Sequence, residues 1–191
     1  MGDEKLTLDV GDATLLERAL RATVGYERVV VISAALAASV RPVAEGPRTT
    51  YVINDAPERG MAHSLRLADA KISKDRALAV VLGDTPLVDA DLIATIVAAR
   101  GDNDVAYPVR AGIPGHPVVF GPSARAGIAR LPDGDSIRTL RSDVRLRRVE
   151  VPIGDERPFV DVDTAADLAR ARAIVDGNGA NLGRESRHSL G

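Results

Sequence analysis

The chain has 191 residues, of which 45% are hydrophobic and 3% aromatic, and its 25 basic and 27 acidic side chains leave a net charge of −2. This length and apolar content suffice for one hydrophobic core, so we expect a single domain. The lack of cysteine excludes disulfides, thiolate metal sites and cysteine nucleophiles. The balanced charge and scarce aromatic residues argue against nucleic acid as a partner.

No apolar segment approaches the ~20 residues needed to span a bilayer, and the first residues are too polar for a signal peptide. We therefore expect no membrane partner and a cytoplasmic location.

Strands and helices alternate along the first half of the sequence. Leucines and alanines recur at helical spacing after the N-cap candidates Asp12 and Thr14, and the following apolar run is typical of a buried strand. This alternation predicts a helix at 13–24, a strand at 28–33, a helix at 34–45, a strand at 49–53, a helix at 61–70 and a strand at 77–82.

The second half continues in the same way. It is predicted to contain a helix at 88–100, a hairpin-like pair of strands at 104–109 and 117–120, helices at 123–130 and 136–142, a strand at 146–151, an edge segment at 159–164 and a helix at 165–176. Such alternation indicates a three-layer α/β/α domain on a mostly parallel sheet, covering residues 1–176. Residues 177–191 have no apolar period and are predicted to form a disordered tail.

The strand predicted at 77–82 has no polar residue, which is typical of a central strand covered on both faces. It ends abruptly at Gly83 and Asp84, and Pro86 prevents a helical continuation. Ligands of open α/β sheets bind at the carboxyl ends of such strands, where a carboxylate suits a hard cation. On this pattern alone, a simple turn or helix cap is the favoured interpretation of Asp84, and the rest of the chain changes that balance.

Five motifs, in this order along the chain, resemble those of MobA-like nucleotidyltransferases. They are Met1-Gly-Asp-Glu-Lys5, Gly60-Met-Ala-His-Ser-Leu-Arg66, Leu82-Gly-Asp-Thr-Pro-Leu87, Gly115-His-Pro-Val-Val-Phe120 and Asp161-Val-Asp-Thr-Ala-Ala-Asp-Leu168. The third and fourth motifs are more similar to the molybdenum-cofactor cytidylyltransferases than to the guanylyltransferase branch. The resemblance implies a Rossmann-like nucleotide-diphospho-sugar transferase fold.

Members of that family normally begin with a strand and a glycine-containing loop, immediately before the motif that starts here at Met1. The backbone amides of this loop hold the triphosphate. The sequence shows no such segment. Two explanations are open: further residues precede Met1, or the protein is a degenerate relative.

The resemblance implies transfer of a nucleoside monophosphate to a phosphorylated acceptor, with release of pyrophosphate. It places Mg²⁺ on Asp84 and Asp163, and oxygen ligands of this kind suit that ion. Asp84 and Lys5 are the implied catalytic residues, with the Lys5 ammonium placed on a phosphate. Asp161 is predicted to be an edge or loop carboxylate outside the metal site.

The remaining implied residues bind the two substrates. Nucleotide contacts are assigned to Gly2, Lys5, Gly60, Ser64 and Gly83, and acceptor contacts to Gly115 and His116. The expected partners are a nucleoside triphosphate, with CTP favoured, a phosphorylated cofactor precursor such as molybdopterin, and a molybdoenzyme client. The alternatives are guanylyl transfer to phospholactate or molybdopterin, and a relative that binds nucleotide or cofactor without turnover.

Overall fold

The computed structural model describes residues 3–39 and 48–185. Its strands are β1 (Asp9–Val10), β2 (Ala13–Thr14), β3 (Arg28–Ser33), β4 (Thr49–Asn54), β5 (Leu78–Val80), β6 (Val105–Arg110), β7 (Ile113–Pro114), β8 (Val118–Phe120) and β9 (Arg148–Pro152). Its α-helices are α1 (Leu15–Ala22), α2 (Ala34–Ser39), α3 (Met61–Asp69), α4 (Ala90–Arg100), α5 (Pro122–Arg125), α6 (Ile137–Arg141) and α7 (Ala165–Glu185). Short 3-10 turns are η1 (Asp3–Thr7), η2 (Pro57–Arg59), η3 (Ile128–Arg130) and η4 (Arg157–Phe159).

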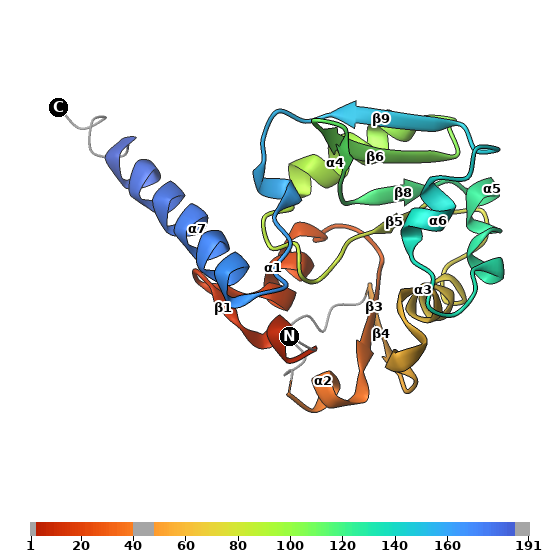
Figure 1. Cartoon of the computed structure of the whole chain (residues 1–191), viewed down its shortest axis with the longest axis horizontal. Helices are drawn as coiled ribbons and strands as arrows, with labels where there is room; N and C mark the ends of the chain where they lie inside the picture. Colours follow the sequence, from red (N-terminus) through yellow and green to blue (C-terminus); the bar gives the residue numbers. More distant parts are fainter. Residues whose placement is uncertain (1–2, 40–47, 186–191) are drawn as a thin grey trace.

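The main strands form two separate sheets (Figure 1). In the smaller sheet, β3 and β4 run parallel, with Arg28 opposite Thr49 and Ser33 opposite Asn54. In the larger sheet β8 lies between β5 and β6 and is antiparallel to both, while β9 pairs in parallel with the other edge of β6. Strands β5, β6 and β9 therefore share one direction, and β7 and β8 run antiparallel to β6. The hairpin-like insertion predicts the antiparallel direction of β8.

Alternate residues of the larger sheet enter two different cores. Val105, Tyr107, Val118 and Phe120 belong to the core beneath α3, α5 and α6. Their neighbours Ala106 and Val119 belong to the core beneath α4. Because successive side chains of a strand point to opposite faces, this division places helices on both faces of the sheet and confirms the predicted three layers.

A third core lies beside the sheets and joins the two ends of the chain. It contains Val10 and Leu15 from the amino-terminal region and Val160, Val162 and Leu168 from the carboxyl-terminal region. Figure 1 shows α7 leaving this core and extending away from the rest of the molecule.

The sequence signals at several helix ends are confirmed. Thr14 begins α1 with a capping box, in which its hydroxyl accepts from Glu17 N and the Glu17 carboxylate accepts from Thr14 N. Asp89 caps α4 by accepting from Leu92 N at 2.8 Å. In both cases a polar side chain satisfies an amide that the first helical turn leaves without a backbone partner.

Three predicted elements differ in the structure. Helix α7 continues to Glu185, nine residues beyond the predicted end at 176, because no proline stops it and extending a formed helix is easier than starting one. Residues 186–191 of the predicted tail lie outside the described residues. Residues 160–164 form no strand, because Val160 and Val162 are buried in the third core and do not pair with the edge of a sheet.

The helix predicted at 123–130 divides into α5 and η3. Gly127 lies between them, in a close approach where an added Cβ would be 2.4 Å from a methyl carbon of Leu140. Helix α2 is described to Ser39, and residues 40–45 of the predicted helix lie outside the described part of the chain. No helix in the described residues is both long and apolar enough to cross a bilayer.

Candidate active site

Lys5 joins the two carboxylates that the sequence predicts to hold a metal. Its Nζ donates to Asp84 Oδ2 at 2.9 Å and to Asp163 Oδ1 at 2.7 Å. The Lys5 side chain is 12% exposed, whereas Asp163 is 70% exposed. Burial alone would lower the pKa of Lys5, but the hydrogen bonds to Asp163 and Asp84 outweigh burial and raise it. The ammonium is therefore held charged between two acidic side chains that are 79 residues apart in sequence.

Backbone contacts place these three side chains together. Asp84 follows β5, and its carbonyl oxygen accepts from Val162 N at 2.9 Å, which holds the segment bearing Asp163 against the end of the strand. The turn η1 carries Lys5 and also packs Leu6 onto Gly83. A Cβ on Gly83 would lie 3.1 Å from Leu6 Cδ2, so glycine permits this close approach. Gly83 thus brings η1 to the carboxyl end of β5.

Asp167 orients the backbone at Asp163. Its Oδ2 accepts from Asp163 N at 3.3 Å, from Thr164 N at 2.9 Å and from Thr164 Oγ1 at 2.7 Å. The bond from the Thr164 hydroxyl is the largest reason that the pKa of Asp167 is lowered. A charged Asp167 therefore fixes the turn into α7 and the exit direction of the Asp163 side chain.

Asp161 lies in the same electrostatic environment, although the sequence analysis places it outside the metal site. Partial desolvation raises its pKa, and the charges of Asp84 and Asp163 raise it further while Lys5 opposes them. The sequence signal for this was the alternation of apolar and acidic residues from Val160 to Asp163. Val160 and Val162 are buried, and residues two apart in an extended segment share a face. Asp161 and Asp163 are consequently on the same, outward side.

The residues present suit a hard divalent cation. Carboxylate oxygens are the ligands that Mg²⁺ prefers, and one or two protein carboxylates commonly bind it together with substrate phosphates. In the described segments, no three His, Asp or Glu side chains are gathered closely enough to form a metal centre by themselves. Any metal here would complete its coordination with water or with oxygen atoms of a phosphorylated ligand, and Lys5 would compete with it for the two carboxylates.

Two of the predicted nucleotide residues lie near the end of β4. Ser64 Oγ accepts from Asn54 Nδ2 at 3.0 Å, and Asn54 is the last residue of that strand. Gly60 has a φ of +79°, which favours glycine, and its missing Cβ leaves room for the backbone of Gly134, 3.3 Å from the position of that atom. Among the described residues, no hydrogen bond joins Gly60 or Ser64 to the Lys5 cluster. Gly2 lies outside the described residues.

The turn at residues 133–135 closes over the start of α3. Asp133 forms ion pairs with Arg59 and Arg66, and Ala62 N donates to Asp135 O at 3.1 Å. These contacts explain the glycine at position 60, because the turn passes directly over it.

His116 is half-buried in the turn before β8, and its peptide bond to Pro117 is cis. Its Nδ1 lies 3.4 Å from the carbonyl oxygen of Val80, the last residue of β5. Desolvation lowers the pKa of His116, and the hydrogen bond to the Val80 carbonyl partly opposes this shift, so the neutral imidazole is favoured.

Gly115 N donates to Pro108 O at 2.8 Å, and a Cβ on Gly115 would lie 2.6 Å from Phe159 Cε1. The glycine therefore fits a close contact between the hairpin and η4.

Arg141 is a further cation on the His116 side that the sequence analysis does not single out. Its guanidinium carbon lies 5.2 Å from the centre of the Tyr107 ring, and Tyr107 Oη donates to Glu150 at 2.8 Å. Desolvation lowers the pKa of Arg141, and the Arg141 charge in turn lowers that of His116. The sequence around Arg141 does not indicate this arrangement, because Tyr107 and Glu150 come from two different strands, β6 and β9.

A comparison with protein families matches residues 1–150 to the MobA-like NTP transferase domain. No curated protein matches the sequence. Many solved structures do match, among them four that illustrate the range.

Rv0371c from Mycobacterium tuberculosis H37Rv is 25% identical with a TM-score of 0.75, and 90% of each chain is covered. Its complex with manganese is 24% identical with a TM-score of 0.71, covering 89% of this chain and 92% of that one.

Two further structures are more distant in sequence. Molybdopterin-guanine dinucleotide biosynthesis protein A from Archaeoglobus fulgidus is 18% identical with a TM-score of 0.69, and 91% of each chain is covered. The 2-C-methyl-D-erythritol 4-phosphate cytidylyltransferase from Thermus thermophilus is 20% identical with a TM-score of 0.68, covering 89% of this chain and 92% of that one. At this identity the likeness is one of fold.

Proposed function

Because this chain belongs to the MobA-like NTP transferase family and has the Rossmann-like fold of nucleotidyltransferases, we propose that it catalyses nucleotidyl transfer at the Lys5 cluster. The observation that carries the proposal is the meeting of Lys5, Asp84 and Asp163. In the proposed reaction, a phosphate oxygen of the acceptor attacks the α-phosphorus of a nucleoside triphosphate. The bond from the α-phosphorus to the bridging oxygen breaks, and pyrophosphate leaves with its electron pair.

The chemistry requires two anionic substrates to meet, so positioning and positive charge contribute most of the catalysis. Lys5 supplies a permanent positive charge for the phosphates, since its raised pKa keeps it protonated. Asp84 and Asp163 would hold a divalent ion, with Asp161 as a further carboxylate nearby. Mg²⁺ bound there would neutralise charge that develops on the departing pyrophosphate. The manganese complex of the structural relative Rv0371c supports a divalent metal in this fold.

The two substrates would lie on opposite sides of the cluster. Gly60 and Ser64 are proposed to face the base and ribose, with Gly2 and Gly83 near the phosphates. Gly115 and His116 are proposed to contact the acceptor. The neutral imidazole can accept or donate a hydrogen bond without repelling the Lys5 charge, and Arg141 adds a positive charge on the same side.

We further propose CTP as the nucleotide and molybdopterin as the acceptor, with a molybdoenzyme as client and the cytoplasm as location. The support is the motif pair of residues 82–87 and 115–120, which resembles the cytidylyltransferase branch. The biosynthesis protein from Archaeoglobus fulgidus supports a molybdopterin acceptor, and by its name it favours guanylyl transfer as the second candidate.

The test is pyrophosphate release by the full chain with molybdopterin, Mg²⁺ or Mn²⁺, and CTP, GTP, ATP or UTP in turn. We expect release with CTP, and a loss of about 10²- to 10³-fold in Asp84→Asn with the fold retained. Asp91→Asn on the exposed side of α4 is the matched control and should retain full activity. Release with GTP alone would favour the guanylyl alternative, and unchanged turnover in Asp84→Asn would overturn the metal assignment.

Thermal shift with the same nucleotides separates binding from turnover. A ligand that binds only the folded state raises the melting temperature. A metal-dependent shift without pyrophosphate release would indicate a relative that binds nucleotide and does not react.

A further inference from the structure

Arg141 is a half-buried side chain that makes no hydrogen bond or ion pair with any residue that the structure describes. It belongs to α6, which lies against the larger sheet and contributes Ile137 and Leu140 to the same core as Tyr107 (Figure 1). The guanidinium carbon is 5.2 Å from the centre of the Tyr107 ring, and this cation–π contact holds it there. Packing therefore positions the guanidinium and leaves its N–H donors unused.

Arg141 differs in this respect from the other arginines that are not exposed. Each of the others in the described segments donates to a backbone or side-chain oxygen; they are Arg18, Arg28, Arg66, Arg100 and Arg125. A polar group that is partly removed from water without a partner costs free energy, and desolvation lowers the pKa of Arg141. In the described part of the chain, Tyr51 Oη is the one fully buried side-chain oxygen or nitrogen without a partner, so the Arg141 nitrogens remain open to solvent and to a ligand.

The turn that bears His116 connects Arg141 to the candidate active site. Gly115 N donates to Pro108 O at 2.8 Å, which holds that turn against β6, the strand beneath the Arg141 guanidinium. The charge of Arg141 lowers the pKa of His116, and the charge of Asp84 raises it. Both charged groups are therefore within electrostatic reach of one imidazole, and Arg141 belongs to the side of the site that is proposed to contact the acceptor.

The charges around Arg141 favour an anion. Lys5, the cation of the proposed catalytic cluster, is already bound to two carboxylates. Arg138, on the preceding turn of α6, adds a positive charge that lowers the pKa of Arg141 further, and its side chain has no partner among the described residues. Glu150 attracts Arg141, but its carboxylate accepts from Tyr107 Oη at 2.8 Å and forms no ion pair with the arginine. The positive charge of Arg141 is thus available to a ligand.

We propose that Arg141 is a specificity-determining residue, which binds a second anionic group of the acceptor, separate from the phosphate that attacks the nucleotide. The inference rests on the proposed function, because it takes the acceptor to lie beside His116. A guanidinium presents a planar fork of donors to an anion, and such charge-assisted hydrogen bonds are stronger where water is partly excluded. Both acceptors considered above carry a suitable group, which is the carboxylate in phospholactate and the dithiolate in molybdopterin.

The test measures binding to the full chain by calorimetry, without nucleotide and under anaerobic conditions. The probes are phospholactate, molybdopterin and ethyl phosphate, which has a phosphate and no second anion. We expect the native chain to bind phospholactate or molybdopterin more tightly than ethyl phosphate, and the tighter of the two identifies the source of the anion. Arg141→Gln should weaken that probe by about 10- to 100-fold and leave ethyl phosphate unchanged.

Two further variants give the controls. Arg141→Lys keeps the charge without the planar fork, so it should recover part of the lost affinity. Arg145→Gln removes an exposed arginine four residues away and should bind all three probes as the native chain does. A purely structural role of the contact with Tyr107 would weaken ethyl phosphate and the other probes alike. In the transfer assay, Arg141→Gln should raise KM for the acceptor and change kcat little, because uniform binding is lost.

The proximity of the two side chains has its own readout. Nuclear magnetic resonance titration should show a higher pKa for His116 in Arg141→Gln, since the arginine charge that lowers it is gone. An unchanged pKa would show that Arg141 lies too far from His116 to share a ligand with it.

The binding results separate this inference from the transfer reaction. Native affinity for all probes in Arg141→Gln, or no preference of the native chain over ethyl phosphate, would overturn the role of Arg141 even if pyrophosphate is released. Selective weakening in Arg141→Gln without pyrophosphate release from any nucleotide would support the anion site and contradict the transfer reaction.

Discussion

Both sheets contain strands with apolar runs, yet the two sheets bury these runs to different extents. In β8 all three residues are buried, and in β6 the first four are buried. In β3 the run Val29 to Val31 is only half-buried, although no residue in it is polar. We call β5, β6, β8 and β9 with their helices the closed half, and β3 with β4 the open half.

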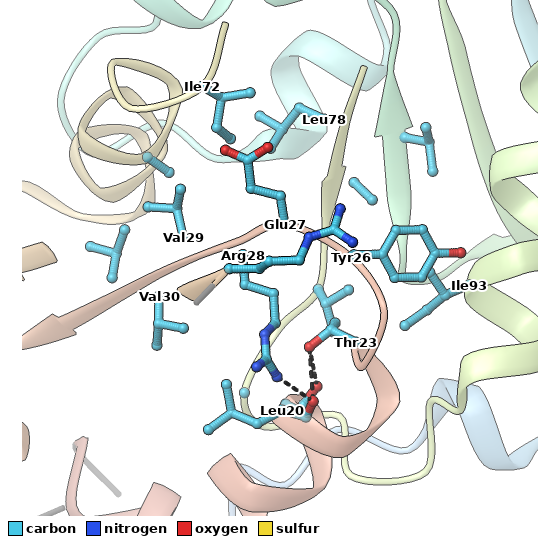
Figure 2. Close-up of a pocket in the computed structure, with 18 of the residues that line it drawn as sticks. Leu20, Thr23, Tyr26, Glu27, Arg28, Val29, Val30, Ile72, Leu78 and Ile93 are labelled. Atoms are coloured by element: carbon cyan, nitrogen blue, oxygen red, sulfur yellow. Dashed lines mark hydrogen bonds between the residues drawn. The ribbon is translucent and has the colours of Figure 1, made fainter. Parts of the chain in front are cut away.

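The difference shows that an apolar sequence does not by itself bury a strand. Within the described residues, the interior strands β6 and β8 have neighbours on both edges and cores on both faces, whereas β3 pairs only with β4 and borders an open space (Figure 2). The closed half positions Asp84 at the end of β5. The amino-terminal segment brings Lys5 to it across the boundary between the halves. The following predictions test this division.

The largest expected effect is on stability in the closed half. Phe120 is fully buried in β8, and Phe120→Ala should reduce the free energy of unfolding by about 3–5 kcal/mol because it leaves a cavity that the sheet cannot close. Val30→Ala in the open half should cost less than about 1 kcal/mol, since that side chain already borders open space. Urea unfolding measures both. Equal losses would show that the halves do not differ.

The second prediction concerns the ion pair that fastens α5 to α3. Arg125 is 1% exposed, donates to Asp69 Oδ1 at 2.7 Å and also caps the carbonyl oxygens of Ile72 and Ser73. Arg125→Met should reduce the free energy of unfolding by about 3 kcal/mol, because it removes the buried donor to Asp69 Oδ1 and leaves that carboxylate paired only with the exposed Lys74.

Adding Asp69→Asn to Arg125→Met should recover part of that loss, because the buried charge is then removed. As control, Arg145→Met removes an arginine that is 80% exposed from its ion pair with Asp143 and should change the urea midpoint little. A loss as large in Arg145→Met would contradict the distinction between buried and exposed pairs.

The third prediction concerns the boundary between the halves. Lys5→Met removes the ammonium that occupies the oxygens of Asp84 and Asp163, so Mn²⁺ should bind the free protein about tenfold more tightly, or about 1.4 kcal/mol. Pyrophosphate release should nevertheless be lost. Electron paramagnetic resonance titration measures the metal affinity, and Lys71→Met on an exposed site is the control. Weaker Mn²⁺ binding in Lys5→Met would contradict competition for these oxygens.

The smallest effect is a pH dependence at Asp161. Desolvation and the neighbouring carboxylates raise its pKa, so the folded state binds this proton more tightly than the unfolded state. Stability from this group is therefore present at low pH and is lost as pH rises from the ordinary value through the raised one.

Asp161→Asn should raise the melting temperature slightly near neutral pH and remove this part of its pH profile, with Asp91→Asn as control. In the native chain, Mn²⁺ affinity should fall as Asp161 protonates, and this fall should be absent in the variant. An unchanged profile in Asp161→Asn would show that Asp161 is not coupled to the cluster.

The sequence by itself determined the features that depend on neighbouring residues. The apolar run ending at Gly83 predicts β5 and places Asp84 at its carboxyl end, and β3 begins and ends where its composition predicts. Thr14 and Asp89 predict the starts of their helices, since a cap bonds to amides two or three residues away. The order of the five motifs predicts the family that the comparison finds.

Only the tertiary structure decided what distant residues do together. Lys5 meets carboxylates 79 and 158 residues away, the charges of Asp84 and Asp163 raise the pKa of Asp161, and desolvation in the fold lowers the pKa of His116. The half-buried state of β3 likewise depends on the strand edge that faces it. The physical reason is that burial, charge interaction and sheet pairing depend on separation in space, whereas spacing along a chain reports only the contacts within a single helix, strand or turn.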